Sequence, residues 1–161
     1  MSICVRIFLM IILGIDPGFG RCGFAVLDVQ GADMKLMTSG AMTTKPQTNF
    51  AERLREIAED FQALLDRYKP DIVGIEDLFF AQNVTTGLQV AQVRGVLTYL
   101  TTKFGAQLRE PKPVEVKSGF TGNGKASKAE IKKMVELTFG KNACPKLDDA
   151  ADAIAVAFVS R

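Results

Sequence analysis

The hydrophobic positions of this chain fall first into short apolar runs and later into helical spacing. Apolar runs at Met10–Asp16, Cys22–Val29 and Leu36–Thr43 predict three strands joined by turns. Strands this close in sequence favour an antiparallel meander. Two later runs, Ile72–Glu76 and the weaker Ala106–Arg109, predict further strands. The first of these two is nearly all apolar, as expected for a central strand covered on both faces.

Apolar residues that recur every three or four positions predict helices between and after these strands. One helix is expected from Phe50 to Tyr68 and a second from about Thr85 to Phe104. Residues 119–124 are typical of an exposed loop, after which Ser127 caps a helix through Phe139. A last helix is expected from about Asp148 to Val159. The pattern predicts an α/β fold, with a mixed sheet of three antiparallel and two crossover strands covered by helices on both faces.

The length and composition are those of a single folded domain. The chain has 161 residues, of which 47% are hydrophobic and 24% charged, so we expect one domain over residues 1–161. Residues 1–9 are expected to form a leader before the first strand, and the sequence leaves open whether Met1 or Met10 is the initiator. The apolar start is too short to span a bilayer and lacks a signal cleavage site, so no membrane partner is expected.

The cysteine and histidine content narrows the chemistry. Cys4, Cys22 and Cys144 are far apart and odd in number, which is typical of a reduced, cytoplasmic protein with structural thiols. Histidine is absent, which removes the commonest general base and the commonest zinc ligand. A hydrolytic reaction would therefore depend on carboxylates or on metal ions.

Four carboxylates stand where the predicted elements can bring them together. Asp16 and Glu76 each end an apolar strand, while Asp149 and Asp152 lie three residues apart on the last helix and share a face of it. The small residues around them, Asp149-Ala150-Ala151-Asp152-Ala153, let this helix approach the sheet closely. Crowded carboxylates repel one another unless cations lie between them. Magnesium or manganese, which prefer oxygen ligands, fit such a site best.

A basic segment complements these acids, although the net charge is only +2. Residues 103–133 hold eight basic side chains against three acidic ones. A basic segment beside an acidic pocket suits a polyanionic substrate whose phosphates are held by lysine. The basic residues are Lys103, Arg109, Lys112, Lys117, Lys125, Lys128, Lys132 and Lys133.

Taken together, the motifs resemble those of the RuvC-type Holliday junction resolvases, a family of the ribonuclease H-like superfamily. The resemblance runs from about Met10 to Val159, and the order and spacing of the motifs are more specific than any one of them. The motifs are Gly14-Ile15-Asp16-Pro17-Gly18, Ile75-Glu76-Asp77-Leu78-Phe79-Phe80, Ala91-Gln92-Val93-Arg94-Gly95, Val116-Lys117, Gly122-Asn123-Gly124-Lys125-Ala126-Ser127-Lys128 and Asp149-Ala150-Ala151-Asp152-Ala153.

The resemblance implies a ribonuclease H-like fold and a homodimer that resolves four-way DNA junctions by paired symmetric nicks. It implies two magnesium or manganese ions in each active site and makes branch-migration machinery a candidate partner. The implied metal ligands and catalytic acids are Asp16, Glu76, Asp149 and Asp152. Lys117 and Lys128 match basic residues of the family's catalytic face. Phe79, Lys117, Lys125 and Lys128 are expected to bind DNA, with Phe79 as an aromatic wedge against the junction bases.

Some assignments stay open at this stage. Asp148 also shares a face with Asp152, but the family register favours Asp149 as the ligand and leaves Asp148 as an N-cap. Asp77 points to the other side of its strand from Glu76. Arg94 is either structural or a phosphate contact.

Three other functions are compatible with parts of the pattern. A related ribonuclease H-like nuclease would act on another nucleic acid, and a degenerate family member would bind junctions without cutting them. An actin-like ATPase or sugar kinase also begins with an Asp-x-Gly loop, but 161 residues leave no room for the second lobe that closes over nucleotide.

Overall fold

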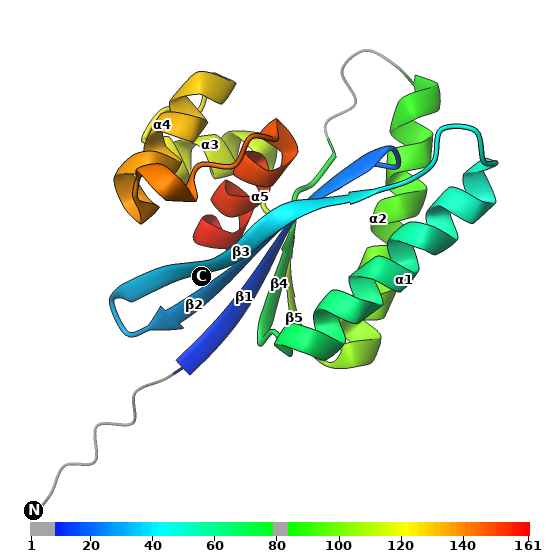
Figure 1. The fold of residues 1–161 in the computed structure, drawn as a ribbon, viewed down its shortest axis with the longest axis horizontal. Helices are drawn as coiled ribbons and strands as arrows, with labels where there is room; N and C mark the ends of the chain where they lie inside the picture. The colour runs from blue at the N-terminus through cyan, green and yellow to red at the C-terminus, as the bar shows by residue number, and fades with distance from the viewer. Residues whose placement is uncertain (1–8, 79–83) are drawn as a thin grey trace, which may run out of the picture.

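The computed structural model describes residues 9–78 and 84–161 and has a sheet between two groups of helices (Figure 1). No helix in this part of the chain is long and apolar enough to span a membrane. Eight of the nine residues of the expected leader lie outside the described residues, and the ninth, Leu9, begins the first strand. The strands are β1 (Leu9–Asp16), β2 (Arg21–Gln30), β3 (Asp33–Thr43), β4 (Ile72–Ile75) and β5 (Gln107–Arg109), and the helices are α1 (Phe50–Tyr68), α2 (Val84–Phe104), α3 (Pro113–Thr121), α4 (Lys128–Phe139), η1 (Lys141–Ala143) and α5 (Asp148–Val159).

The five strands form one mixed sheet in the order β3-β2-β1-β4-β5. The pairs β1–β2 and β2–β3 are antiparallel, as expected for a meander, while β4 pairs with β1 and β5 with β4 in parallel. Because parallel neighbours need a crossover, α1 and α2 connect these strands across one face of the sheet. The predicted mixed sheet with helices on both faces is confirmed.

The helices divide between the two faces of the sheet, as Figure 1 shows. On one face, α1 and α2 cover a core built around Leu13, Val73, Phe61 and Leu97. On the other face, α3, α4 and α5 form a second core that includes Ala25 of β2. The strands β1 and β4 are buried on both sides, which explains their nearly continuous apolar sequences.

Close packing fixes the place of α5 on its face of the sheet. A Cβ atom on Gly14 would lie 2.4 Å from the carbonyl oxygen of Ala153, and one on Gly23 would lie 2.0 Å from that of Asp149. Side chains at these two strand positions would therefore push the helix away. The expected close approach of this alanine-rich helix is confirmed, and it brings the start of α5 to the strand ends.

The structure corrects two sequence predictions. Helix α3 was not expected, and it includes residues 119–121, which were assigned to a loop. Its periodic signal is weak because only Val116 and Phe120 are buried in nine residues. The prediction that Asp148 caps the last helix is also wrong, because Leu147 holds the N-cap position and makes no side-chain cap. The predicted cap at Ser127 is confirmed, since its hydroxyl accepts a hydrogen bond from the Glu130 amide at 3.3 Å.

Candidate functional site

Asp16 and Glu76 end neighbouring strands and face the same helix. Asp16 closes β1, Glu76 follows β4 directly, and the Glu76 amide continues the ladder with a 3.1 Å hydrogen bond to the Ile15 carbonyl. Alternate residues of a strand share a face, and the Cβ positions of Gly14 and Gly74, two residues earlier, both point at α5. The carboxylates of Asp16 and Glu76 therefore lie on the face that α5 covers.

The first turns of α5 bring the other two acids to these strand ends. Gly23, whose Cβ position abuts the Asp149 backbone, is the register partner of Asp16 on β2. Asp149 is thus held one strand away from Asp16, and Asp152 lies one helical turn further along α5. All four acids are partly buried. The sequence prediction that four distant acids meet at one place agrees with this arrangement of elements.

Perturbed pKa values show that these carboxylates affect one another. Burial, followed by repulsion from Glu76, Asp152 and Asp149, raises the pKa of Asp16 to about 8. Burial and the charge of Asp152 raise the pKa of Glu76 to about 7. Burial also raises the pKa of Asp152, and the charge of Asp149 adds to the rise. Acids that resist ionisation in this way are typical of a site that binds cations.

Lys117 and Lys128 approach the acids from the helices beside α5. Lys117, on α3, lowers the pKa of Glu76 and of Asp152 by its positive charge. Lys128, the first residue of α4, has its ammonium 4.0 Å from a carboxylate oxygen of Asp152 and lowers the pKa of that group and of Asp16. Both lysines thus lie beside the acids.

Two other predicted DNA-binding residues, Lys125 and Phe79, are not placed at this cluster by any contact in the described part of the chain. Lys125 is exposed in the loop between α3 and α4, and the described residues provide no acidic partner for its side chain. Phe79, the expected wedge, lies outside the described residues.

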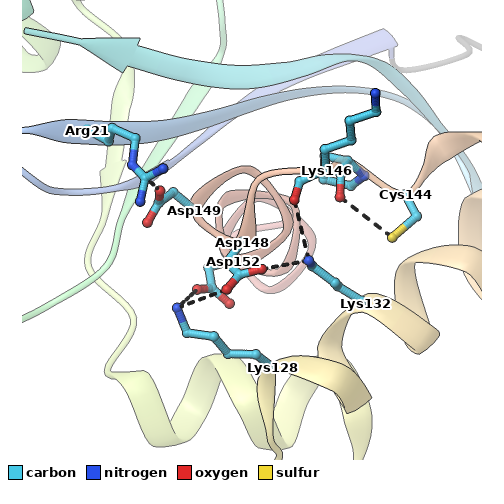
Figure 2. Close-up of polar contacts among 9 residues, drawn as sticks. Arg21, Lys128, Lys132, Cys144, Lys146, Asp148, Asp149 and Asp152 are labelled. Atoms are coloured by element: carbon cyan, nitrogen blue, oxygen red, sulfur yellow. Dashed lines mark hydrogen bonds and ion pairs between the residues drawn. The ribbon is translucent and has the colours of Figure 1, made fainter.

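Arg94 and Asp148, both near the site, each form structural ion pairs with two partners. Arg94 contacts Asp77 at 3.0 Å and also pairs with Glu110, so it ties α2 to the segments that follow β4 and β5. Asp148 contacts Lys132 at 2.6 Å and Lys128 at 3.6 Å, which links α4 to α5 (Figure 2). Asp148 therefore holds a helix-to-helix contact instead of a cap.

The four carboxylates are suitable ligands for hard divalent cations, although their side chains are not arranged around a metal position in this structure. Carboxylate oxygens are the ligands that magnesium and manganese prefer, and Asp149 Oδ2 is buried without accepting a hydrogen bond in the described structure. Yet no group of three or more histidine, cysteine or acidic side chains in the described ranges is placed to hold a metal. The two acids of α5 are instead turned toward Arg21 and Lys128 (Figure 2).

Arg21 is a residue of this site that sequence reasoning missed. Its Nε atom lies 3.1 Å from Asp149 Oδ2, without the alignment of a hydrogen bond. An exposed arginine at the start of an antiparallel strand carries no sequence signal of its own. The one available signal was its spacing from Gly23: residues two apart on a strand share a face, and Gly23 lies on the face that α5 covers.

Known proteins resemble this chain in sequence and in fold. The family model described as "Crossover junction endodeoxyribonuclease RuvC" matches residues 12–160. The protein of that name from Heliobacterium modesticaldum is 42% identical over 148 residues, which cover 92% of this chain and 91% of the relative. Its namesake from Brachyspira hyodysenteriae is 43% identical, with coverage of 92% and 91%.

A solved structure agrees with these sequence matches. Thermus thermophilus RuvC in complex with Holliday junction substrate matches with a TM-score of 0.86 and 30% identity, over 93% of this chain and 92% of that chain. The family match over residues 12–160 includes all four proposed ligands. The chain belongs to the RuvC family of crossover junction endodeoxyribonucleases.

Proposed function

We propose that this chain resolves four-way DNA junctions by hydrolysing phosphodiester bonds at the site formed by Asp16, Glu76, Asp149 and Asp152. The observation that carries the proposal is that these acids, from two strand ends and one helix, lie close enough for burial and the charges of neighbouring acids to raise the pKa of Asp16, Glu76 and Asp152. The family match supports the substrate, because the relatives are named crossover junction endodeoxyribonucleases and a matched structure holds a Holliday junction.

The proposed cofactors are two magnesium or manganese ions per site, held by the four carboxylates. Bound ions of this kind activate an attacking water and stabilise the leaving oxygen of an in-line displacement. The chain's own residues would hold the ions and the scissile phosphate. Lys117 and Lys128 lie beside the acids and would balance the negative charge that develops on the phosphate.

The proposed DNA path follows the basic residues that surround the acids. Lys128, the first residue of α4, contacts Asp148 and Asp152 of α5, and Lys125 lies in the loop just before it. Phosphates bound there would be directed toward the carboxylates. Phe79 follows Glu76 by three residues, and the proposal that it wedges against junction bases rests on its motif position.

Paired nicks need two active sites, so we propose that the enzyme is a homodimer. The candidate contact surface is the outer side of α2, where Leu88 is 54% exposed and Tyr99 is 61% exposed. These two residues are three helical turns apart and share a side with Gly95. Arg94, the charged residue between them, turns inward to Asp77 and Glu110, which leaves this side uncharged between Leu88 and Tyr99.

Sedimentation tests the dimer directly. The wild type should sediment as a dimer, and Tyr99→Glu should shift it toward the monomer because the charge would be buried in the contact. Leu137→Glu is the matched control, since Leu137 is 72% exposed on α4, away from the proposed surface. A monomeric wild type at working concentration would contradict the dimer.

The decisive experiment is incubation with a mobile synthetic junction and magnesium, with cut positions mapped on all four strands. Symmetric nicks in two opposing strands are expected, with linear duplex and RNA–DNA hybrid left intact. Cleavage of the hybrid would favour a ribonuclease H-like enzyme of another specificity. Tight junction binding without any cleavage would favour a non-catalytic binding protein.

We also propose a cytoplasmic location, where DNA is the substrate. Cys22 and Cys144 are free thiols in the structure, as a reducing compartment allows. Contact with branch-migration machinery stays a prediction from the family resemblance.

A further inference from the structure

Arg21 occupies a position that its strand dictates. It is the first residue of β2, two residues before Gly23, so the two share a face of the sheet. That face is the one on which the Asp149 backbone abuts Gly23. Since the guanidinium also lies 3.1 Å from Asp149 Oδ2, Arg21 reaches the acidic site from the strand next to Asp16 (Figure 2).

The pairing places a permanent positive charge on one of the proposed metal ligands. Arginine does not lose its proton in proteins, so pH cannot break this contact. The Asp149 side chain is only 24% exposed, whereas the Arg21 side chain is 56% exposed and free to swing into solvent. Of the two partners, Arg21 is therefore the one that can leave.

The two strand-end acids, Asp16 and Glu76, have no such ion pair in the described part of the chain, although each is repelled by neighbouring carboxylates. Asp149 is paired with Arg21, and Asp152 lies 4.0 Å from Lys128. Arg21 and Lys128 thus balance part of the negative charge of the site. This balance explains why the described acids are not arranged around a metal position.

We propose that Arg21 is an exchangeable counter-ion of Asp149, which gives up the carboxylate when divalent ions load and then grips a phosphate of the DNA. This inference rests on the proposed function and adds a residue and an order of events to it. Divalent ions concentrate more charge than a guanidinium and would displace it from Asp149. The released planar fork matches the oxygens of a phosphate.

Two opposite effects of one substitution follow. Arg21→Gln removes a competing charge, so the free protein should bind metal more tightly. The same variant should bind junction DNA more weakly once metal is present, because a phosphate contact is lost. A residue that only braces the fold would weaken both, so the opposite signs identify the exchange.

The first measurement is calorimetric titration of the protein alone with Mn²⁺. Arg21→Gln should bind about two- to fivefold more tightly than the wild type, the range expected for one partly exposed ion pair. Arg55→Gln is the matched control, because Arg55 pairs with Glu59 on the exposed side of α1 at 2.8 Å. Weaker metal binding by Arg21→Gln, or binding equal to that of Arg55→Gln, would overturn the proposal.

The second measurement compares junction affinity in Ca²⁺ and in EDTA at the same ionic strength, with uncut junction verified in each sample. Arg21→Gln should weaken binding about three- to tenfold in Ca²⁺ and less than twofold in EDTA, where Arg21 is engaged with Asp149. Arg21→Lys should recover part of the loss in Ca²⁺, since it keeps the charge without the fork. An equal loss in both buffers would refute the exchange.

The binding of Mn²⁺ and of junction DNA by the wild type distinguishes a failure of this inference from a failure of the proposed function. If the wild type bound neither Mn²⁺ nor the junction, the proposed function itself would fail. If it bound both and Arg21→Gln behaved as Arg55→Gln does, only the exchange would be wrong.

Discussion

Asp16→Asn should make the metal-free protein more stable, and the gain should grow as the pH rises. Burial and the neighbouring acids raise the pKa of Asp16 from 3.8 to about 8 in the folded state. Between these values the folded protein keeps a proton that the unfolded chain releases, so each rise in pH favours unfolding. Asparagine carries no such proton and is free of this cost.

The size of the effect follows from the same shift. The gain should rise by up to about 1.4 kcal/mol for each pH unit between pH 5 and pH 7. The gain per pH unit should be about half as large if the proton is shared with Glu76, whose pKa is also raised. Over the two units the variant should therefore gain about 1.4 to 2.8 kcal/mol on the wild type.

Urea unfolding in EDTA at pH 5, 6 and 7 measures this gain. Asp60→Asn, at an exposed position of α1, reports the effect of the same substitution away from the site. Magnesium should stabilise the wild type more than Asp16→Asn, because only the wild type has all four ligands. A difference between variant and wild type that stayed constant from pH 5 to pH 7 would refute the reasoning.

Three further substitutions test other parts of the site. Glu76→Gln should abolish cleavage while junction binding is kept or tightened, as measured by gel shift, because a negative charge near phosphate is removed. Lys128→Gln should lower the slope of log affinity against log salt by about 1 if it contacts phosphate, and the exposed Lys133→Gln on the same helix is its control. Gly14→Ala should cost about 1 to 3 kcal/mol in urea unfolding and weaken metal binding, because its Cβ would lie 2.4 Å from the Ala153 carbonyl oxygen and displace α5.

Much of the fold could be predicted because its signals are local. The apolar residues of β1, β2 and β4 follow the patterns expected for strands buried on one or both faces. The ends of these strands lie within a residue of the predicted ends. Helix α3 escaped prediction because two buried side chains give too little periodicity. The predicted N-cap at Asp148 is wrong, because Leu147 holds that position and the Asp148 carboxylate pairs with lysines of α4.

The sequence by itself determined which acids end the strands and which lie on the last helix, since strand alternation and helical spacing act between near neighbours. Only the tertiary structure decided which cations these acids meet. Asp149 meets Arg21 because α5 crosses β1 and β2 where Gly14 and Gly23 let it lie against the sheet. Asp148 meets Lys132 because α4 packs against α5. Such contacts depend on packing between segments far apart in sequence, and no local pattern encodes them.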